Sequence, residues 1–557
     1  MLPLLLAVTT LMPQSTAPAA RTREQLAEAI RAVGAFHDLD FDADELALMV
    51  DDVAQSRDGY AVLRGERLTN DVVPPLYFLP GAPGGELGPR TSLALELAPP
   101  IERPAHLEEL AFADIETLAA LVRARRVSCV ELTEMFLARL ERHDATLHCV
   151  ITLLDTRALA QARVLDAELE AGHWRGPLHG IPWVAKDLLA VAGAPTTWGA
   201  TPFREQTLDD TATVVERLDA AGAVLLAKAS LGALAWGDVW YDGTTRNPWN
   251  PTEGSSGSSA GSASATAAGL ATFAIGSETL GSIVSPAMRC GNSALRPSFG
   301  LVPKGGAMNL AWSMDKLGPL ARSVRDSAIV FDAIRGADPR DRSSVDRPFV
   351  LSSATGAGAE PGAEPQSASL AGRRVGYLAG EYDAVPGWRQ MLLDLTRLGA
   401  ELVEITLPDA PTEAMTDLLA VEAAAVFDGL TRSGADDQLV RQVRFAWPNV
   451  LRQAQLVSAV DYLRANRLRT PLIEGVERAL RDVDALVHPS FAAGILATLN
   501  LTGHPTIVVP AGFDEVGEPF GLSFSARLFG ESDLVAVADA WQRATEHHTK
   551  HPLAYLR

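Results

Sequence analysis

The sequence predicts an α/β fold: one large mixed β-sheet flanked by helices, with a small helical addition at the N-terminus. Two stretches of the chain carry this prediction, because in both of them amphipathic helical patterns alternate with short apolar runs of strand length. The first stretch runs from about residue 150 to 340, and the second runs from residue 372 to the end. The composition agrees with it, since 47% of the 557 residues are hydrophobic and 21% are charged, which suffices for a large core.

In chain order, the first feature is the N-terminus. Residues 1–20 contain an apolar run, LPLLLAVTTLM, followed by APA, which offers an A-x-A cleavage site. The first basic residue, Arg21, comes only after this run, so the basic region of an ordinary signal peptide is missing. We interpret residues 1–20 as a candidate signal peptide, which favours export to the periplasm or the medium over a cytoplasmic location. The alternatives are a different start site and a disordered tail.

Residues 21–105 follow as a helical segment and a connector. Apolar residues recur three and four positions apart in 23–36 and in 43–56, which predicts two amphipathic helices. The stretch 73–90 is rich in Pro and Gly and predicts an extended connector. We expect one large domain from residue 106 to residue 557.

The large domain is expected to begin with a pair of helices over residues 113–144, with Asp114 and Ser128 as N-caps. A low-complexity stretch, 351–371, predicts a loop between the two α/β stretches. The other expected helices are 156–172, 211–222 and 533–548, and the expected strands are 181–189, 223–229, 270–277, 373–380 and 483–490.

The totals narrow the classes of partner and cofactor. The net charge of −21 argues against nucleic acid or an anionic membrane surface as the main partner, because phosphate binding needs clustered Lys and Arg. No apolar window reaches the roughly 18 residues that a membrane span needs. The three cysteines form no C-x-x-C pair, which argues against a disulfide framework and a zinc site. His547, His548 and His551 fall at the end of the last predicted helix, where we interpret them as cations near solvent rather than as metal ligands.

The stretch GSSGSSAGSASATAAG, residues 254–269, has two interpretations. Its composition is typical of a flexible linker, but also of a loop in which chemistry needs backbone and hydroxyls close together. The glycines of its first half favour a loop, and its second half can form a helix of small residues. Because it leads into a predicted buried strand, 270–277, and a turn at 278–282, we favour the active-site loop over the linker.

Three places in this part of the chain carry candidate chemistry. Lys186 lies in an otherwise apolar strand, where it either reaches out of the strand end to pair with Asp187 or stays buried with a lowered pKa and accepts a proton. The second place is the hydroxyl-rich loop of residues 255–259, and the third is Ser282, in the turn at a strand end. Each alone is a weak signal, since Ser and Gly are ordinary turn residues.

In their order and spacing, these places match a known pattern. GPLHGIPWVAKDLLA surrounds Lys186, RNPWNPTEGSSGSSAGS contains the loop, and GSETLGSIVSPAMRCG surrounds Ser282, which lies 24 positions after Ser258. Together with CGNSALRPSFG and NLTGHPTIVVPAGF, these runs resemble the amidase signature family of serine hydrolases. The resemblance is dense over about residues 110–340 and looser over 370–550.

The resemblance implies the amidase signature fold and the hydrolysis of a small-molecule carboxylic amide through an acyl-serine intermediate, with no metal and no organic cofactor. It implies a Ser–cisSer–Lys triad with Ser282 as nucleophile, Ser258 as bridging serine and Lys186 as base. It also implies an oxyanion hole made by the backbone N–H groups of Thr279, Leu280, Gly281 and Ser282.

Five positions depart from the family pattern. Ser256, Ala260 and Leu280 stand where glycine is usual, and Leu280 would cost about 1–2 kcal/mol if its φ were positive. Many members carry an arginine two or three positions after the nucleophile, where this chain has Val284 and Ser285. We infer a pocket without a local cation at this point and a preference for neutral or apolar acyl groups.

Three alternatives stay open. The chain also resembles the A-type component of glutamyl-tRNA(Gln) amidotransferase, in which the same triad hydrolyses glutamine, although an export signal would exclude that role. GSSAG, residues 257–261, fits a G-x-S-x-G nucleophile elbow with Ser259 as nucleophile, but no hydrophobic strand precedes it. The third alternative is a binding protein that kept the fold, because Leu280 lies in the implied oxyanion hole. The sequence is compatible with a homodimer and does not identify the amide.

Overall fold

The computed structural model describes residues 22–36, 39–65, 97–351, 369–380 and 382–556, and the single residues 70, 78, 91 and 95. The candidate signal peptide, almost all of the predicted connector and most of the low-complexity stretch lie outside the described residues. The chain divides into two compact units, residues 1–72 with 432–434 and residues 73–431 with 435–557. The domain limits expected from the sequence stay predictions.

The first unit contains a pair of helices, α1 (Arg23–Phe36) and α2 (Ala43–Gly65), at the two places where apolar periodicity predicts them. Leu26, Leu46 and Val50 are the buried apolar side chains of this pair among the described residues.

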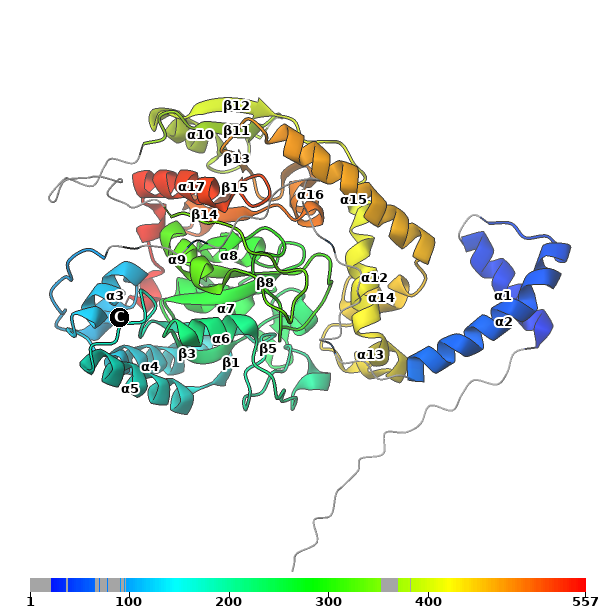
Figure 1. The fold of residues 1–557 in the computed structure, drawn as a ribbon, viewed down its shortest axis with the longest axis horizontal. Coiled ribbons are helices and arrows are strands. Elements are labelled where there is room, and N and C mark those ends of the chain that lie inside the picture. The colour runs from blue at the N-terminus through cyan, green and yellow to red at the C-terminus, as the bar shows by residue number, and fades with distance from the viewer. Residues whose placement is uncertain are drawn as a thin grey trace, which may run out of the picture. The chain divides into compact units, whose positions relative to one another are not determined.

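The described residues of the second unit form one mixed sheet of eleven strands, as predicted (Figure 1). β3, β2 and β8 run parallel to one another, as do β13, β11 and β12, and the other neighbours pair antiparallel. In sheet order the strands are β1 (Val150–Leu153), β3 (Val224–Ala229), β2 (Pro182–Lys186), β8 (Phe273–Glu278), β10 (Lys316–Ala321), β9 (Ser293–Arg296), β14 (Thr506–Phe513), β15 (Pro519–Ser525), β13 (Ala485–His488), β11 (Arg374–Leu378) and β12 (Glu401–Ile405). Two small hairpins lie outside it, β4 (Val239–Trp240) with β5 (Gly243–Thr244) and β6 (Arg246–Asn247) with β7 (Asn250–Gly254).

Helices flank the sheet, with α3, α4 and α5 together at one side of the second unit and α12, α14 and α15 at another (Figure 1). β2 and β3 are buried along their whole length, which explains their near-continuous apolar sequences. The helices are α3 (Ile115–Arg123), α4 (Cys129–Leu147), α5 (Asp155–Glu170), α6 (Thr213–Ala220), α7 (Ala260–Ala267), α8 (Val284–Cys290), α9 (Val324–Ile334), α10 (Trp388–Arg397), α11 (Thr412–Met415), α12 (Asp417–Val426), α13 (Asp428–Ser433), α14 (Trp447–Ala454), α15 (Ala459–Ala479), α16 (Ile495–Thr502) and α17 (Glu531–Thr545).

The two N-caps predicted from the sequence are confirmed. Asp114 accepts the backbone N–H of Thr117 at 2.7 Å at the start of α3. Ser128 accepts the backbone N–H of Glu131 at 3.1 Å at the start of α4, and the Glu131 side chain returns the contact as a capping box.

The parallel pair β2 and β8 positions the candidate site. Ala185 of β2 is in register with Ile275 of β8, so the carboxyl ends of the two strands lie at the same edge of the sheet. Lys186 ends β2, and the turn before α8 follows the end of β8. Side chains that are about 95 residues apart in the sequence therefore meet at this edge.

The C-terminal residues contribute to the packing around α7. Arg139 of α4 is wholly buried, and its guanidinium donates to the carbonyl oxygens of Ala268, Gly269 and Tyr555. The last residues of the chain and the end of α7 are thus bound to the same side chain.

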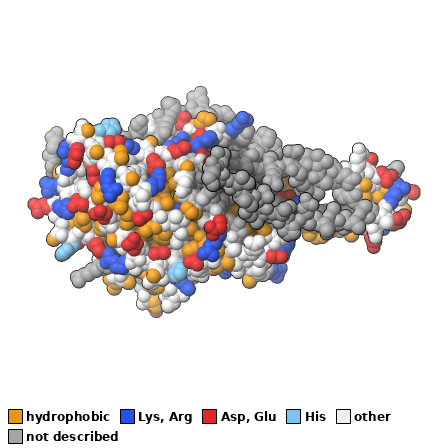
Figure 2. Space-filling view, turned by 90° about the horizontal axis from the view of Figure 1, so that it is seen from below, with side chains coloured by type: hydrophobic (Ala, Val, Ile, Leu, Met, Phe, Trp, Pro, Cys, Tyr) orange, Lys and Arg blue, Asp and Glu red, His pale blue; other side chains and the backbone are white. Residues whose placement is uncertain are grey.

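Among the described helices, none is long and apolar enough to cross a membrane. On the face seen in Figure 2, Lys and Arg side chains lie among Asp and Glu side chains rather than in a patch of their own.

Candidate active site

Lys186 is wholly buried, and its ammonium nitrogen contacts the hydroxyl oxygens of three serines. The distances from Nζ are 2.8 Å to Ser258 Oγ, 2.8 Å to Ser277 Oγ and 3.1 Å to Ser259 Oγ. Burial lowers the pKa of Lys186 well below its ordinary value. A lysine held in this way can lose its proton at a lower pH than an exposed lysine, so it is a candidate base.

The interpretation in which Lys186 pairs with Asp187 is wrong. Asp187 is paired with Lys228 of β3, with 2.7 Å between Oδ1 and Nζ, and both side chains are wholly buried. The other carboxylate oxygen of Asp187 accepts the backbone N–H and the hydroxyl of Thr197. Among the described residues, Lys186 has hydroxyl partners but no carboxylate within salt-bridge distance.

Ser258 lies in the loop before α7 and is wholly buried. The peptide bond between Gly257 and Ser258 is cis. Gly257 has to be glycine, because a Cβ at this position would lie 1.9 Å from the carbonyl oxygen of Gly237. All eight residues of α7 are buried, so the predicted order of loop and then small-residue helix is confirmed and the linker interpretation is wrong.

Ser259 does not have the surroundings of a nucleophile elbow. The strand before it, β7, belongs to a two-stranded sheet apart from the main one, and its middle residues are exposed. Ser259 itself is wholly buried, donates its hydroxyl to the carbonyl oxygen of Ser277 and accepts the Ser277 backbone N–H. We therefore interpret Ser259 as a structural contact of Lys186 rather than as a nucleophile.

Ser282 lies in the turn between β8 and α8 and is half-buried, in contrast to the wholly buried Ser258. Its carbonyl oxygen accepts the backbone N–H of Ser259 at 3.1 Å. This hydrogen bond binds the turn that carries Ser282 directly to the loop that carries Ser258.

The implied oxyanion hole lies in the same turn. In the part of the chain that the structure describes, the backbone N–H groups of Thr279, Leu280, Gly281 and Ser282 donate to no protein acceptor. Gly281 has the positive φ of this turn, +89°, and Leu280 does not share it. The leucine therefore carries no left-handed backbone penalty, and only its N–H matters to an oxyanion.

A buried ion pair fixes the chain on both sides of Ser282. Glu278 accepts the backbone N–H groups of Ile283 and Val284 at 2.8 and 2.9 Å, and its second oxygen lies 2.8 Å from Arg296 Nη1. Burial alone would raise the pKa of Glu278, but Arg296 and the Val284 N–H bring it to about 2. Glu278 is therefore a carboxylate at neutral pH.

A second buried carboxylate holds the start of the turn. Asp315 accepts the hydroxyl of Thr279 at 2.6 Å and the backbone N–H groups of Leu310 and Ala311. Burial raises the pKa of Asp315. Sequence reasoning missed both carboxylates, and the one signal for Glu278 was a charged residue at the end of an apolar strand.

Two of the five departures from the family pattern contact each other. Ser256 Oγ lies 2.7 Å from Ser285 Oγ, and both residues are half-buried. Ser256 has a φ of +61°, which accounts for glycine being usual there, and its backbone N–H donates to Asp238. A hydroxyl pair therefore stands beside Ser282, where many members of the family carry an arginine.

The C-terminal histidines differ from the expectation of cations near solvent. His551 stacks on Phe112 with ring centroids 4.1 Å apart. Burial lowers the pKa of His548 and of His551 to about 4, so both are neutral at neutral pH. Among the described residues, no group of His, Cys, Asp or Glu could hold a metal ion.

Comparison with known proteins places these features in a family. The family model for amidases matches residues 131–496. The A-type component of the glutamyl-tRNA(Gln) amidotransferase of Chloroflexus aurantiacus is 34% identical over 502 residues, covering 80% of this chain and 99% of the relative. The putative amidase AmiD of Mycobacterium tuberculosis is 32% identical over 492 residues, covering 81% and 98%. The structure of peptide amidase from Stenotrophomonas maltophilia superposes with a TM-score of 0.68 at 30% identity, covering 79% of this chain and 98% of that one.

Proposed function

This chain belongs to the amidase signature family and is a hydrolase of carboxylic amides, and we propose that it acts through an acyl-Ser282 intermediate with Ser258 and Lys186 as its proton relay. The observation that carries the proposal is the contact of 2.8 Å between Lys186 Nζ and Ser258 Oγ, at a lysine that is wholly buried. The three residues come from β2, the loop before α7 and the turn after β8.

The relay begins with neutral Lys186. A serine hydroxyl attacks an amide carbonyl only when a base takes its proton during the attack. Ser258 takes the proton of Ser282 while Lys186 takes the proton of Ser258, so the bond from Ser282 Oγ to the carbonyl carbon forms as Lys186 becomes an ammonium. The hydroxyl of Ser258 is neutral before and after this step.

The tetrahedral intermediate places a negative charge on the former carbonyl oxygen. The N–H groups of residues 279–282 are donors without a protein acceptor in the described chain, which supports their role as the oxyanion hole. Loss of one donor of this kind typically costs about 2.7–4 kcal/mol of transition-state stabilisation.

Collapse of the intermediate breaks the C–N bond. An amine anion cannot leave, so the proton held by Lys186 returns through Ser258 to the departing nitrogen. Water then attacks the acyl-serine by the same relay in reverse and releases the carboxylic acid.

The acyl group next to Ser282 is expected to be neutral or apolar. Val284 and the Ser256–Ser285 hydroxyl pair stand where a cation would select a carboxylate. If small dicarboxylic monoamides gave the highest kcat/KM in a substrate panel, this part of the proposal would be wrong.

A second candidate function follows from the relatives that are A-type components of glutamyl-tRNA(Gln) amidotransferase. In that case the chain would hydrolyse glutamine and need partner proteins for its full activity. Hydrolysis of simple amides by the purified chain alone, with no stimulation by charged tRNA and partner proteins, would exclude it. We also propose export, which N-terminal sequencing of the mature chain in its native host would test.

The experiment for the triad is labelling with a fluorophosphonate, followed by peptide mass spectrometry. We expect one adduct on Ser282 in the wild type and none in Lys186→Ala. An adduct on Ser259 instead would establish the nucleophile elbow, and the absence of any adduct together with the absence of amide hydrolysis would favour a binding protein.

A further inference from the structure

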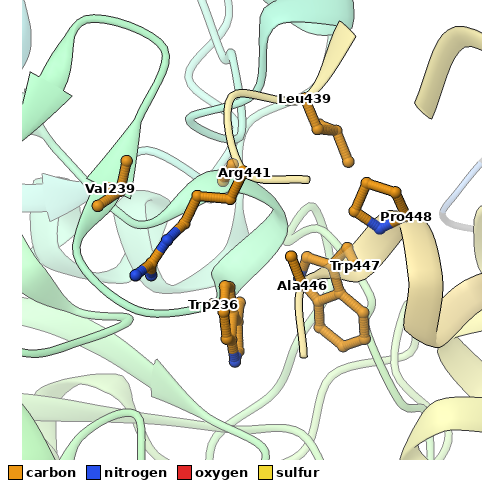
Figure 3. A pocket seen from close by; sticks show the side chains of 8 residues that line it. Trp236, Val239, Leu439, Arg441, Ala446, Trp447 and Pro448 are labelled. Carbon is orange, nitrogen blue, oxygen red and sulfur yellow. The ribbon is translucent and has the colours of Figure 1, made fainter. Parts of the chain in front are cut away.

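A pocket of about 220 Å³ lies beside the loop that carries Ser258 (Figure 3). One wall comes from the segment before and within β4, with Trp236 and Val239, and the other comes from the segment that leads into α14, with Leu439, Arg441 and Trp447. The pocket was not a sequence prediction, because its two walls are about 200 residues apart in the chain.

The pocket adjoins the active site through the segment from Trp236 to Val239. Gly237, inside that segment, packs so closely on Gly257 that a Cβ there would lie 1.9 Å from the Gly237 carbonyl oxygen. Asp238, the next residue, accepts the backbone N–H of Ser256 at 3.1 Å. The same short segment therefore supports the Ser258 loop and forms a wall of the pocket.

The pocket combines an apolar lining with one cation. The guanidinium of Arg441 stacks on the Trp236 ring, with 4.7 Å between its Cζ and the ring centroid. In the described part of the chain, no carboxylate lies within salt-bridge distance of Arg441, although the sequence carries 69 acidic residues against 48 basic ones. Trp447 is held in place by its indole N–H, which donates to the carbonyl oxygen of Leu234 at 2.8 Å.

We infer that this pocket binds the amine portion of the substrate and that the amine bears a carboxylate, so that the substrate is an N-acyl amino acid with an apolar side chain. The inference rests on the proposed function, in which Ser258 gives its proton to the departing nitrogen. The group on that nitrogen therefore leaves past Ser258, on the side where the pocket adjoins the loop. A stacked guanidinium keeps its N–H edges free to bind a carboxylate, and the indole rings pack on an apolar side chain.

The chemistry balances with water as the only co-reactant. The C–N bond of the N-acyl amino acid breaks, Ser282 Oγ keeps the acyl group, and the nitrogen takes the proton from Ser258. The products after hydrolysis are a carboxylic acid and a free amino acid.

The test compares three amides with the same acyl group: N-hexanoyl-L-phenylalanine, N-hexanoyl-2-phenylethylamine and hexanamide. We expect wild-type kcat/KM to be highest for N-hexanoyl-L-phenylalanine. Arg441→Met should lower the ratio of kcat/KM for the acid over the phenylethylamide by about 10- to 100-fold, the usual weight of a charge-assisted hydrogen bond. Arg441→Lys keeps the charge without the planar fork and should restore part of this ratio.

The matched control is Arg444→Met, because Arg444 belongs to the same segment but is exposed and does not line the pocket. This variant should keep the wild-type ratio. A wild type without preference for the acid, or a ratio that Arg441→Met leaves unchanged, overturns the inference while hydrolysis of hexanamide still supports the proposed function.

Binding separates the two proposals if no amide is hydrolysed. Calorimetry on Ser282→Ala measures the Kd of N-hexanoyl-L-phenylalanine without turnover. A Kd that Arg441→Met weakens by about 10-fold or more supports the subsite even if the triad is wrong, and absence of binding overturns it.

Discussion

Two wholly buried lysines lie on adjacent parallel strands, and their surroundings differ in one respect. Lys228 of β3 has a carboxylate partner, Asp187, at 2.7 Å, whereas Lys186 of β2 has the hydroxyls of Ser258, Ser259 and Ser277. Burial lowers the pKa of both lysines, but Asp187 opposes this for Lys228, and the pKa of Lys186 falls further below its ordinary value.

The comparison separates a structural charge from a chemical one. A buried ion pair keeps its lysine protonated, so Lys228 can bind neighbouring oxygens but cannot take a proton. A buried lysine among hydroxyls gains nothing comparable from being charged and can act as a base. The predictions below test this difference, from the largest effect to the smallest.

Lys186→Met is expected to lower kcat/KM by about 10⁴- to 10⁶-fold, because residues that act as one catalytic unit fail together. The free energy of unfolding should stay near the wild-type value, since no charge is left unpaired. Steady-state kinetics and urea unfolding of the same preparation measure both. A variant that keeps more than a hundredth of the activity would exclude Lys186 as the base.

Lys228→Met should have the opposite profile. It leaves the Asp187 carboxylate buried without a counter-charge, which is expected to destabilise the fold by about 3–5 kcal/mol in urea unfolding. Molecules that remain folded should react with fluorophosphonate at Ser282 as the wild type does. Loss of labelling without loss of stability would show that the two lysines do not differ as we describe.

Ser277→Asp would make the surroundings of Lys186 resemble those of Lys228. A carboxylate beside Lys186 raises its pKa, and the ammonium form is inactive as a base, so we expect about 10- to 100-fold lower kcat/KM at neutral pH that recovers as the pH rises. Ser277→Asn has the same size without the charge and should keep the wild-type pH profile. An equal loss in both variants at every pH would mean a packing defect.

The wild-type pH profile gives a further test. Because the neutral form of Lys186 is the active one, kcat/KM should fall as the pH drops through its lowered pKa and be level between that pKa and the ordinary value near 10.5. The folded lysine binds fewer protons than the unfolded one over this same interval, so stability should rise with pH across it and be lost as the pH falls. A rate that keeps rising tenfold per pH unit up to about 10.4 would mean an unperturbed lysine.

Ser256→Gly should have the smallest effect. It removes one member of the Ser256–Ser285 hydroxyl pair but relieves the positive φ of +61°, so we expect kcat/KM to change by less than about 10-fold. Ser285→Ala, which removes the other hydroxyl without changing the backbone preference, should be the more damaging of the two for polar acyl groups. Kinetics with acetamide and hexanamide would measure this.

Sequence patterns predicted the mixed sheet, α1, the caps of α3 and α4, and the order of loop, helix, strand and turn around Ser258 and Ser282. The Lys186 contact was weighed against pairing with Asp187, and the sequence could not decide between them. Adjacent residues of a strand point to opposite faces, so Asp187 meets a side chain of the neighbouring strand instead.

Contacts between distant elements were beyond the sequence for the same reason. The Glu278–Arg296 pair, the Asp315 contacts and the pocket with Arg441 each depend on strand register and loop packing across many residues. Spacing in one sequence does not encode which of several buried charges will meet. The Ser256–Ser285 contact could be suspected only because both positions depart from the family pattern.

The Arg139 clamp has a consequence for how the protein is made. Arg139 and the loop with Ser258 leave the ribosome early, but Tyr555, which shares the Arg139 guanidinium with Ala268 and Gly269, is among the last residues to be synthesised. The helix after Ser258 therefore obtains its full set of contacts only after termination. A nascent chain still attached to the ribosome would lack this anchor, and activity would begin with release.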